Sequence, residues 1–360
     1  MTEGPVPSAG GGRLPDAVRC ALAASFRLAA PDGVLRVDPV ARRGRMAESA
    51  RVLVQETGGR RRSVFAKWPS RHARIRRVAR HSGAYEREAR FYRDLADDCG
   101  TAVPEVHHSG YDARTGAFVL LLEDLVDARP GDDLACSVTD VRRALRAVAP
   151  LHARWAHGPL AAAPWLPDCR SRTTLRYTRF ELDRIARAAA RGRFAHAPAR
   201  PLLPLLEELA LALDEFFEKA AAGPRTLVHG DLHMDQVLLP DDRDAVIVDW
   251  QLVQLGDIGT DVARLITMSL PAEERRRHES DLLETYRTAL EECGGPPYRG
   301  GELLDAYRRG VRWTAFVNTS YWLACGDSAR SGLAKDGFHD VVFGRITSAA
   351  ADHGLLRHRP

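Results

Sequence analysis

Hydrophobic and polar positions divide the chain into an early part with strand periodicity and a later part with helical periodicity. In the early part, residues 52–56 and 63–68 alternate apolar and polar side chains around a Thr-Gly-Gly turn, and 117–125 is an apolar run that ends in acid. These patterns predict strands, the last of them buried. Residues 84–95 carry apolar side chains at three- and four-residue spacing, which predicts a helix.

From residue 126 onward the apolar spacing is mainly helical, over 138–155, 202–222, 282–290 and 303–323. The exception is a predicted β-hairpin, in which two short apolar runs flank the turn cluster 240–244. The pattern therefore predicts an α+β fold, with a small β-rich N-lobe over 18–125 and a larger, mainly helical C-lobe over 126–360. Residues 1–17, rich in Gly and Pro, are expected to be disordered.

Polar side chains gather at the open end of the predicted hairpin. If its strands pair symmetrically, Gln236 lies opposite Asp249, and an amide oxygen beside a carboxylate provides the hard oxygen ligands that Mg²⁺ prefers. Asp231 lies on the loop that enters the hairpin, where it can accept a proton from an acceptor hydroxyl. This order of side chains is the one that protein kinases use for phosphoryl transfer. Turn capping is the alternative interpretation of the same residues.

Lysine is rare in this chain, which contains only Lys67, Lys219 and Lys335. Lys67 ends the predicted strand 63–68, the position from which a kinase lysine contacts nucleotide phosphates. Its expected partner is Glu88 on the predicted helix, with Glu86 as the second choice. A solvated lysine at a strand edge and a surface glutamate remain the alternatives.

The segment 40–49 occupies the place of a phosphate-covering loop. Gly44 and Ser49 are its candidate phosphate contacts, although one glycine cannot provide a complete glycine-rich cradle of backbone amides. An ordinary β-turn explains this segment equally well.

Composition restricts the class of protein. The chain has 360 residues, 45% hydrophobic residues and a net charge of +4 with mixed signs, so no nucleic-acid partner is expected. Its six cysteines form no C-x-x-C pair, and no signal segment is evident, which favours a cytoplasmic protein. No apolar run reaches the roughly 18 residues needed to cross a bilayer, so no membrane partner is expected.

The polar motifs resemble a known superfamily. His229-Gly-Asp-Leu-His, Asp249-Trp-Gln and Asp261-Val-Ala-Arg-Leu together resemble the aminoglycoside phosphotransferase and choline kinase-like small-molecule kinases. Asp249-Trp-Gln and Glu88-x-x-Phe-Tyr are also similar to the ecdysteroid kinase-like branch. The metal-binding Asn of the superfamily is replaced by Gln236, as in the bacterial maltokinase-like branch.

The resemblance implies a bilobal protein kinase-like fold and an ATP-dependent O-phosphotransferase. The implied cofactors are Mg²⁺ and ATP, with GTP as a second option. The resemblance also implies that Lys67 binds the nucleotide phosphates, that Glu88 orients Lys67 in the nucleotide site, and that Gln236 and Asp249 hold the metal. Asp231 would act as the base.

Further roles follow from the same resemblance. The backbone at Glu123 and Leu125 would bind the adenine edge. His233 and Asp235 are candidate acceptor contacts, although Asp235 can also cap the following turn. His152 and His229 are expected to be structural, and Asp261 is expected to accept backbone amides of the loop that carries Asp231.

The acceptor is expected to be a small hydroxylated molecule, such as an antibiotic, a nucleoside or a sugar-like natural product, and antibiotic resistance is one role that fits. A protein kinase is disfavoured because no Arg follows His229 and no Ala-Pro-Glu follows Asp249. A catalytically dead nucleotide-binding pseudokinase is suggested only by Gln236 and the glycine-poor loop. The sequence leaves the oligomeric state open.

Overall fold

The computed structural model describes residues 14–29, 33–40, 46–156, 163–169, 171–325 and 337–356. The chain divides into two compact units. Unit 1 consists of Met1–Asp97 and Pro104–Asp127, and unit 2 consists of Asp98–Val103 and Ala128–Pro360. The segment 98–103 was predicted in the N-lobe, but it hydrogen-bonds within unit 2, where the N–H of Ile247 donates to the carbonyl of Ala102 at 3.0 Å.

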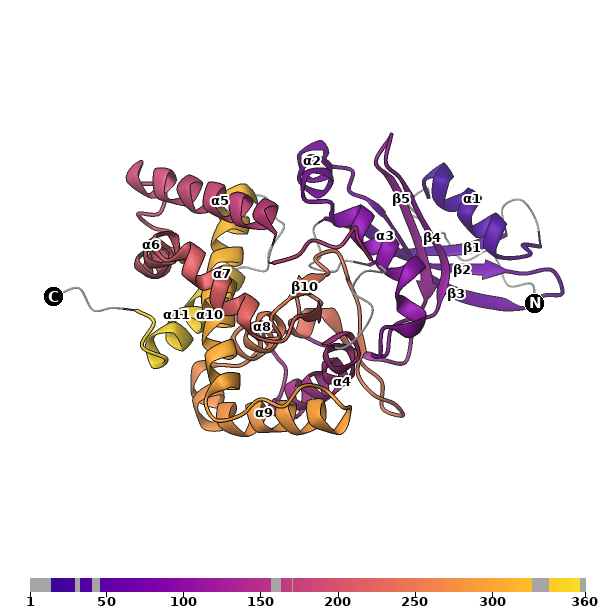
Figure 1. The fold of residues 1–360 in the computed structure, drawn as a ribbon. Coiled ribbons are helices and arrows are strands. Elements are labelled where there is room, and N and C mark those ends of the chain that lie inside the picture. The colour runs from indigo at the N-terminus through magenta and orange to yellow at the C-terminus, as the bar shows by residue number, and fades with distance from the viewer. Residues whose placement is uncertain are drawn as a thin grey trace. The chain divides into compact units, whose positions relative to one another are not determined.

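Unit 1 is built on a five-stranded antiparallel sheet with the strand order β1-β2-β3-β5-β4. Figure 1 shows helices packed against this sheet. The elements are α1 (Asp16–Ser25), β1 (Val34–Pro39), β2 (Ala47–Gln55), β3 (Arg61–Pro69), α2 (Ala73–Ser82), α3 (Ala84–Asp94), β4 (Val106–Asp112) and β5 (Ala117–Glu123); the 3₁₀ turn η1 (Ala96–Asp98) follows α3.

The alternation of side chains along β3 gives the sheet two different faces. Val64 and Ala66 are fully buried in the cluster that α1 covers. Lys67 therefore points to the opposite face. Tyr85 of α3 covers that face, because its ring stacks on Phe118 of β5 with the centroids 5.0 Å apart. The sheet thus has one side with a buried apolar cluster and another side on which a charged residue lies beneath a helix.

The start of unit 1 differs from the prediction. Residues 14–17 were expected to belong to a disordered segment, but α1 begins at Asp16 and Leu14 is buried with Val18 and Leu22. The apolar spacing of these three residues turns one face of the helix toward the sheet, which orders the segment. Residues 1–13 lie outside the described part of the chain.

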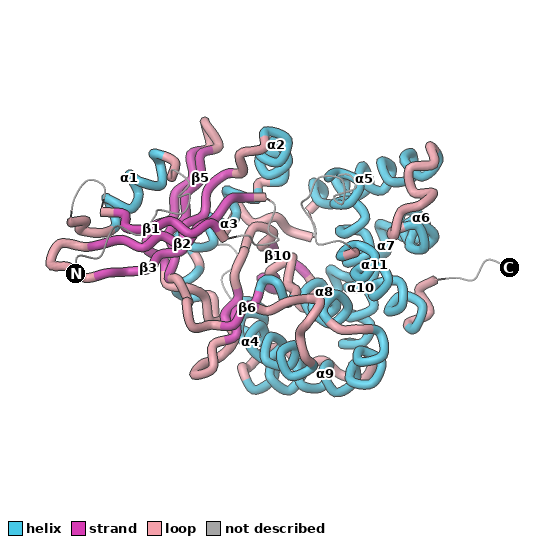
Figure 2. Tube along the Cα trace, turned by 180° about the vertical axis from the view of Figure 1, so that it is seen from behind, coloured by secondary structure: helices cyan, strands magenta, loops and turns pink. Residues whose placement is uncertain are grey.

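Unit 2 is mainly helical around two small sheets, β6-β8-β9 and β7-β10 (Figure 2). Its strands are β6 (Arg129–Pro130), β7 (Thr226–Val228), β8 (Val237–Leu239), β9 (Val246–Ile247) and β10 (Gln254–Gly256). Its helices are α4 (Val138–Ala156), α5 (Arg172–Ala190), η3 (Arg200–Leu202), α6 (Leu203–Leu211), α7 (Leu213–Ala222), η4 (Met234–Gln236), α8 (Gly259–Ser269), α9 (Ala272–Glu292), α10 (Glu302–Cys325) and α11 (Phe338–Asp352). The helix predicted over 202–222 is interrupted at Ala212.

The hairpin forms where it was predicted, but its register differs by one residue. Val237 pairs with Ile247, and the N–H of Val248 donates to the carbonyl of Gln236 at 3.0 Å. Gln236 therefore lies opposite Val248, and the prediction that it lies opposite Asp249 was wrong. Asp249 is the next residue and leaves the strand with φ 70°, the single positive value among the described non-glycine residues.

None of the helices in the described ranges combines the length and the apolar character that a membrane-spanning segment requires.

Candidate active site

A largely buried ion pair lies on the charged face of the unit 1 sheet. Lys67 Nζ contacts both carboxylate oxygens of Glu88, at 2.7 and 2.8 Å. The Glu88 side chain is 2% exposed and that of Lys67 is 13% exposed. Glu86, the second choice, instead forms an exposed pair with Arg90 on the same helix at 2.8 Å. The lysine and the glutamate that were predicted to pair are thus in contact.

The other nucleotide candidates of unit 1 lie in different settings. Ser49 on β2 is directly opposite Lys67, so the two side chains share a face of the sheet. Glu123 ends β5, and its N–H donates to the carbonyl of Glu105 at 2.8 Å. Leu125 follows β5 and is half-buried. Gly44 lies outside the described residues, and the nucleotide contacts of all these residues remain predictions.

In unit 2, Asp261 of α8 holds the start of the loop 229–236, called here the site loop. Its carboxylate accepts the N–H groups of His229 at 2.6 Å and Gly230 at 2.8 Å, and it contacts His152 Nε2 at 3.2 Å. Burial opposes ionisation, but these partners, His152 first, hold the pKa of Asp261 below its usual value. The role expected for Asp261 from the sequence is confirmed by these contacts.

The backbone at Gly230 requires a glycine. Its φ is 80°, and a Cβ atom would lie 2.2 Å from the carbonyl oxygen of Leu252. The ring of His229 is buried beneath the site loop, with Nδ1 accepting the N–H of Asp231 at 3.2 Å and Nε2 at 3.0 Å from the carbonyl of Val248. Burial lowers the pKa of His229, which matches a neutral ring with its proton on Nε2.

Asp231 forms an ion pair that the sequence analysis missed. Its carboxylate contacts the guanidinium group of Arg264, which projects from α8. Both residues are buried, with exposed fractions of 8% and 7%. Arg264 lies three residues after Asp261, and positions i and i+3 share one face of a helix. That spacing was the signal in the sequence that could have identified Arg264.

A second missed residue, Asp133, is fully buried beneath the other end of the site loop. It accepts hydrogen bonds from the N–H of Met234 at 2.8 Å and from Ser269 Oγ at 3.2 Å, and it contacts His233 Nδ1 at 2.7 Å. In return, Asp235 Oδ1 accepts the N–H of Asp133 at 3.0 Å. No sequence pattern links residue 133 to this loop, so local periodicity could not have revealed it.

His233 stands between Asp133 and Gln236. Burial disfavours a charged ring, but the neighbouring carboxylate of Asp133 outweighs it and raises the pKa of His233 to about 9. The Nε2 atom of His233 lies 3.3 Å from the side-chain nitrogen of Gln236. The acceptor contacts proposed for His233 and Asp235 stay predictions, since the contacts given above are internal to unit 2.

Two sets of side chains in unit 2 have the chemistry of metal ligands. Ligand atoms of Asp133, His233 and Asp235 lie within 4.8 Å of one another. Both oxygens of Asp133 already accept hydrogen bonds, so this group is better described as a hydrogen-bond network. Gln236 and Asp249 provide an amide oxygen and a carboxylate from neighbouring positions at the end of the hairpin, and this donor set suits Mg²⁺.

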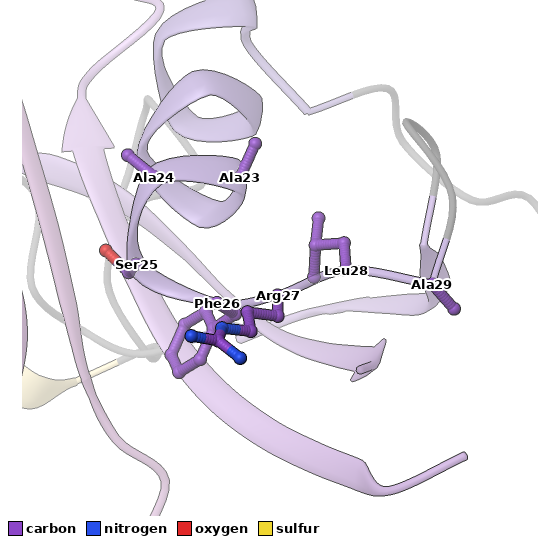
Figure 3. A pocket seen from close by; sticks show the side chains of 7 residues that line it. All are labelled: Ala23, Ala24, Ser25, Phe26, Arg27, Leu28 and Ala29. Carbon is purple, nitrogen blue, oxygen red and sulfur yellow. The ribbon is translucent and has the colours of Figure 1, made fainter. Parts of the chain in front are cut away.

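A surface hollow at the end of α1, lined by residues 23–29, contains none of the predicted site residues (Figure 3). It is formed by one short segment with mainly apolar side chains.

The sequence profile of the phosphotransferase enzyme family matches residues 42–297 of the chain. No curated protein matches it in sequence. Among solved structures, choline kinase LicA from Streptococcus pneumoniae is similar to it, with 14% identity, coverage of 94% of this chain and 98% of that chain, and a TM-score of 0.57.

Two further solved structures show the same fold. The AMP-bound spectinomycin phosphotransferase APH(9)-Ia is 12% identical, with coverage of 92% of this chain and 97% of that chain and a TM-score of 0.55. The GDP and kanamycin complex of APH(2")-IIia is 14% identical, with coverage of 92% and 97% and a TM-score of 0.54. The α+β, bilobal protein kinase-like fold expected from the sequence is therefore confirmed.

Proposed function

We propose that this chain, which belongs to the phosphotransferase enzyme family and is a small-molecule kinase, transfers the γ-phosphate of ATP to a hydroxyl group of its acceptor. The observation that carries the proposal is the site loop. Asp261 fixes the backbone at its start, Asp231 and Gln236 both extend from this loop, and Asp249 directly follows Val248, which is hydrogen-bonded to Gln236. The order of a base, an amide and a second carboxylate suits phosphoryl transfer.

Asp231 is the proposed base. It would accept a hydrogen bond from the acceptor hydroxyl and take its proton as the new bond to phosphorus forms. Because the transition state of phosphoryl transfer is loose, most of the benefit comes from positioning and electrostatic stabilisation. The ion pair with Arg264 supports this role, since it holds the carboxylate in one orientation.

Lys67, oriented by Glu88, is proposed to bind the nucleotide phosphates, with Ser49 and the backbone at Glu123 and Leu125 as further nucleotide contacts. Gln236 and Asp249 would hold Mg²⁺, which when bound offsets the negative charge of the phosphates. The complexes of related structures with AMP and with GDP support a nucleotide ligand and leave ATP and GTP both to be tested.

The proposed acceptor is a hydroxylated antibiotic, nucleoside or sugar-like natural product. The kanamycin complex of a similar structure supports a small-molecule acceptor. The positive charge of Arg264 balances the negative charge of Asp231, so this carboxylate by itself gives little attraction for a cationic acceptor. Neutral hydroxyl compounds therefore belong in the acceptor library beside the aminoglycosides.

The test is Mg²⁺-dependent release of ADP or GDP across a library of hydroxylated antibiotics, nucleosides, sugars and amino alcohols. The wild type and Asp231→Asn are compared, and the product is identified by its added phosphate in mass spectrometry. A product that forms with the wild type and not with the variant supports the proposal. Nucleotide binding without turnover indicates a pseudokinase, transfer to proteins indicates a protein kinase, and absence of nucleotide binding overturns the proposal.

A further inference from the structure

A glutamine that binds a metal ion must be held in place, because its side chain has three rotatable bonds and loses their freedom on binding. In Gln236 the backbone is fixed first. Its N–H donates to the carbonyl of His233 at 2.9 Å, and its own carbonyl accepts the N–H of Val248 at 3.0 Å. The side-chain amide then meets His233 Nε2 at 3.3 Å. The imidazole ring is thus the neighbour that can fix the plane of the amide.

The imidazole is itself fixed by Asp133. This carboxylate contacts His233 Nδ1 with one oxygen and accepts the N–H of Met234 with the other. The backbone carbonyl of Asp133 accepts a hydrogen bond from Arg345 of α11 at 2.6 Å, which anchors the segment from its other side. A Cβ atom at Gly131 would lie 2.1 Å from the carbonyl oxygen of Met234, so only glycine permits this close approach.

We propose that Asp133 and His233 are positioning residues that orient the amide of Gln236 for Mg²⁺. The proposal rests on the proposed function, which makes Gln236 a metal ligand. A neutral His233 accepts an N–H of the amide and leaves the amide oxygen on the other edge. A protonated His233 donates to that oxygen, which retains a second lone pair. The contact therefore fixes the plane of the amide in both states of the ring, while the edge that carries the oxygen differs between them.

The arrangement has the form of an outer shell that orients a metal ligand, and loss of such a partner typically costs about 10- to 100-fold in metal affinity. We therefore expect His233→Ala to raise the apparent Kd for Mg²⁺ by about that factor, measured by calorimetric titration of Mg²⁺ into the full chain with saturating ADP. Binding of ADP in the presence of EDTA should change by less than about twofold, because the orientation of Gln236 affects the metal alone.

The double-variant cycle is the decisive part of the experiment. In a Gln236→Ala background, His233→Ala should no longer weaken Mg²⁺ binding, because the side chain that it orients is gone. His353→Ala is the matched control, since His353 is also paired with a carboxylate, Glu279 at 2.8 Å, and lies outside the site. This control should leave the Mg²⁺ titration unchanged.

If His233→Ala does not fold, Asp133→Asn replaces it, because it keeps the volume and most hydrogen bonds and should weaken Mg²⁺ binding in the same direction. An unchanged Mg²⁺ affinity in the His233 variant, or an equal loss in the Gln236→Ala background, would overturn the inference. If the wild-type chain bound ADP with no dependence on Mg²⁺, the proposed metal-binding role of Gln236 would itself be wrong. This outcome is distinct from a wild type that binds Mg²⁺ and a His233 variant that binds it equally well, which would overturn only the positioning role.

Discussion

Each unit has an ion pair that involves candidate functional residues, and the two pairs are positioned in opposite ways. Lys67 and Glu88 in unit 1 extend from a regular strand and a regular helix, and both side chains follow from the periodicity of those elements. Asp231 in unit 2 extends from a loop with a glycine at φ 80°, and its partner Arg264 comes from a helix that begins 28 residues later, at Gly259. The second pair is buried and the first is largely buried, but only the first is set by secondary structure.

This difference shows where the fold holds each group. In unit 1 the strand β3 and the helix α3 supply the geometry, so the surrounding core supports the pair. In unit 2 the site loop has no ladder of its own, and the N–H groups of His229, Gly230 and Met234 are satisfied by the buried carboxylates of Asp261 and Asp133. Changes to single buried carboxylates should therefore affect unit 2 more than changes to single surface charges.

The largest expected effect is that of Asp231→Asn. An amide cannot take the proton of the acceptor, so kcat should fall by about 10²- to 10⁴-fold. Nucleotide affinity should change little, because the base contacts the acceptor. The measurement is steady-state phosphate transfer, with Asp242→Asn in the exposed hairpin turn as the matched control. Turnover within threefold of wild type would remove Asp231 from the base role.

The next effect concerns the support of the site loop. In Asp261→Asn an NH₂ group replaces one of the two oxygens that accept backbone N–H groups, so one of these N–H groups loses its acceptor. The free energy of unfolding should therefore fall by about 2–4 kcal/mol. Urea denaturation followed by circular dichroism measures this change. Asp281→Asn is the control, because its carboxylate side chain is 61% exposed and its ion pair with Arg142 is expected to contribute little. Equal losses in both variants would contradict the loop-support role.

A smaller effect is expected for the pair in unit 1. Glu88→Gln retains the shape of the side chain but removes the charge that orients Lys67, and a hydrogen bond to a charged group contributes about 1.5–3 kcal/mol. We expect KM for ATP to rise by about tenfold. Glu86→Gln on the same helix is the matched control and should leave KM unchanged, because its pair with Arg90 is more exposed. A shift in the Glu86 variant alone would show that the wrong glutamate was assigned.

The smallest effect tests a buried ionic network of unit 2 away from the site. Burial opposes the charge of Glu279, but hydrogen bonds from His353, Tyr307 and Arg275 hold its pKa below 4.5. A lowered pKa in the folded state means that the network stabilises the protein above about pH 4.5 and that this contribution is lost as the pH falls through the lowered value. Between pH 3 and pH 6 the melting temperature of Glu279→Gln should therefore depend less on pH than that of the wild type. Superimposable pH profiles would contradict this assignment.

Several elements could be predicted from the sequence because their patterns are local. The strand that carries Lys67, the helix that carries Glu88 and the hairpin after Gln236 were all found. The strands β1 and β4 were missed, because their residues are only partly buried and show no clean alternation. The helices α1, α2, α5 and α11 were not predicted either.

The hairpin shows the limit of such predictions. Its two strands were located correctly, but the register was wrong by one residue, so Gln236 faces Val248. Register depends on which residue centres the turn, and the cluster 240–244 offers several equivalent polar residues. The left-handed backbone of Asp249, directly after Val248, could not be inferred from the residue type alone.

The sequence by itself determined the family and the order of the candidate residues. It also determined which lysine and which glutamate pair, because the periodicity of their strand and helix turns the two side chains toward each other. Only the tertiary structure decided which buried groups hold the site loop. Asp133 and His233 are 100 residues apart, and Arg264 follows Asp231 by 33 positions. A hydrogen bond depends on closeness in space, and folding brings such residues together through the packing of whole helices. Local periodicity shows which face of a helix is buried, but it does not show which loop or helix packs against that face.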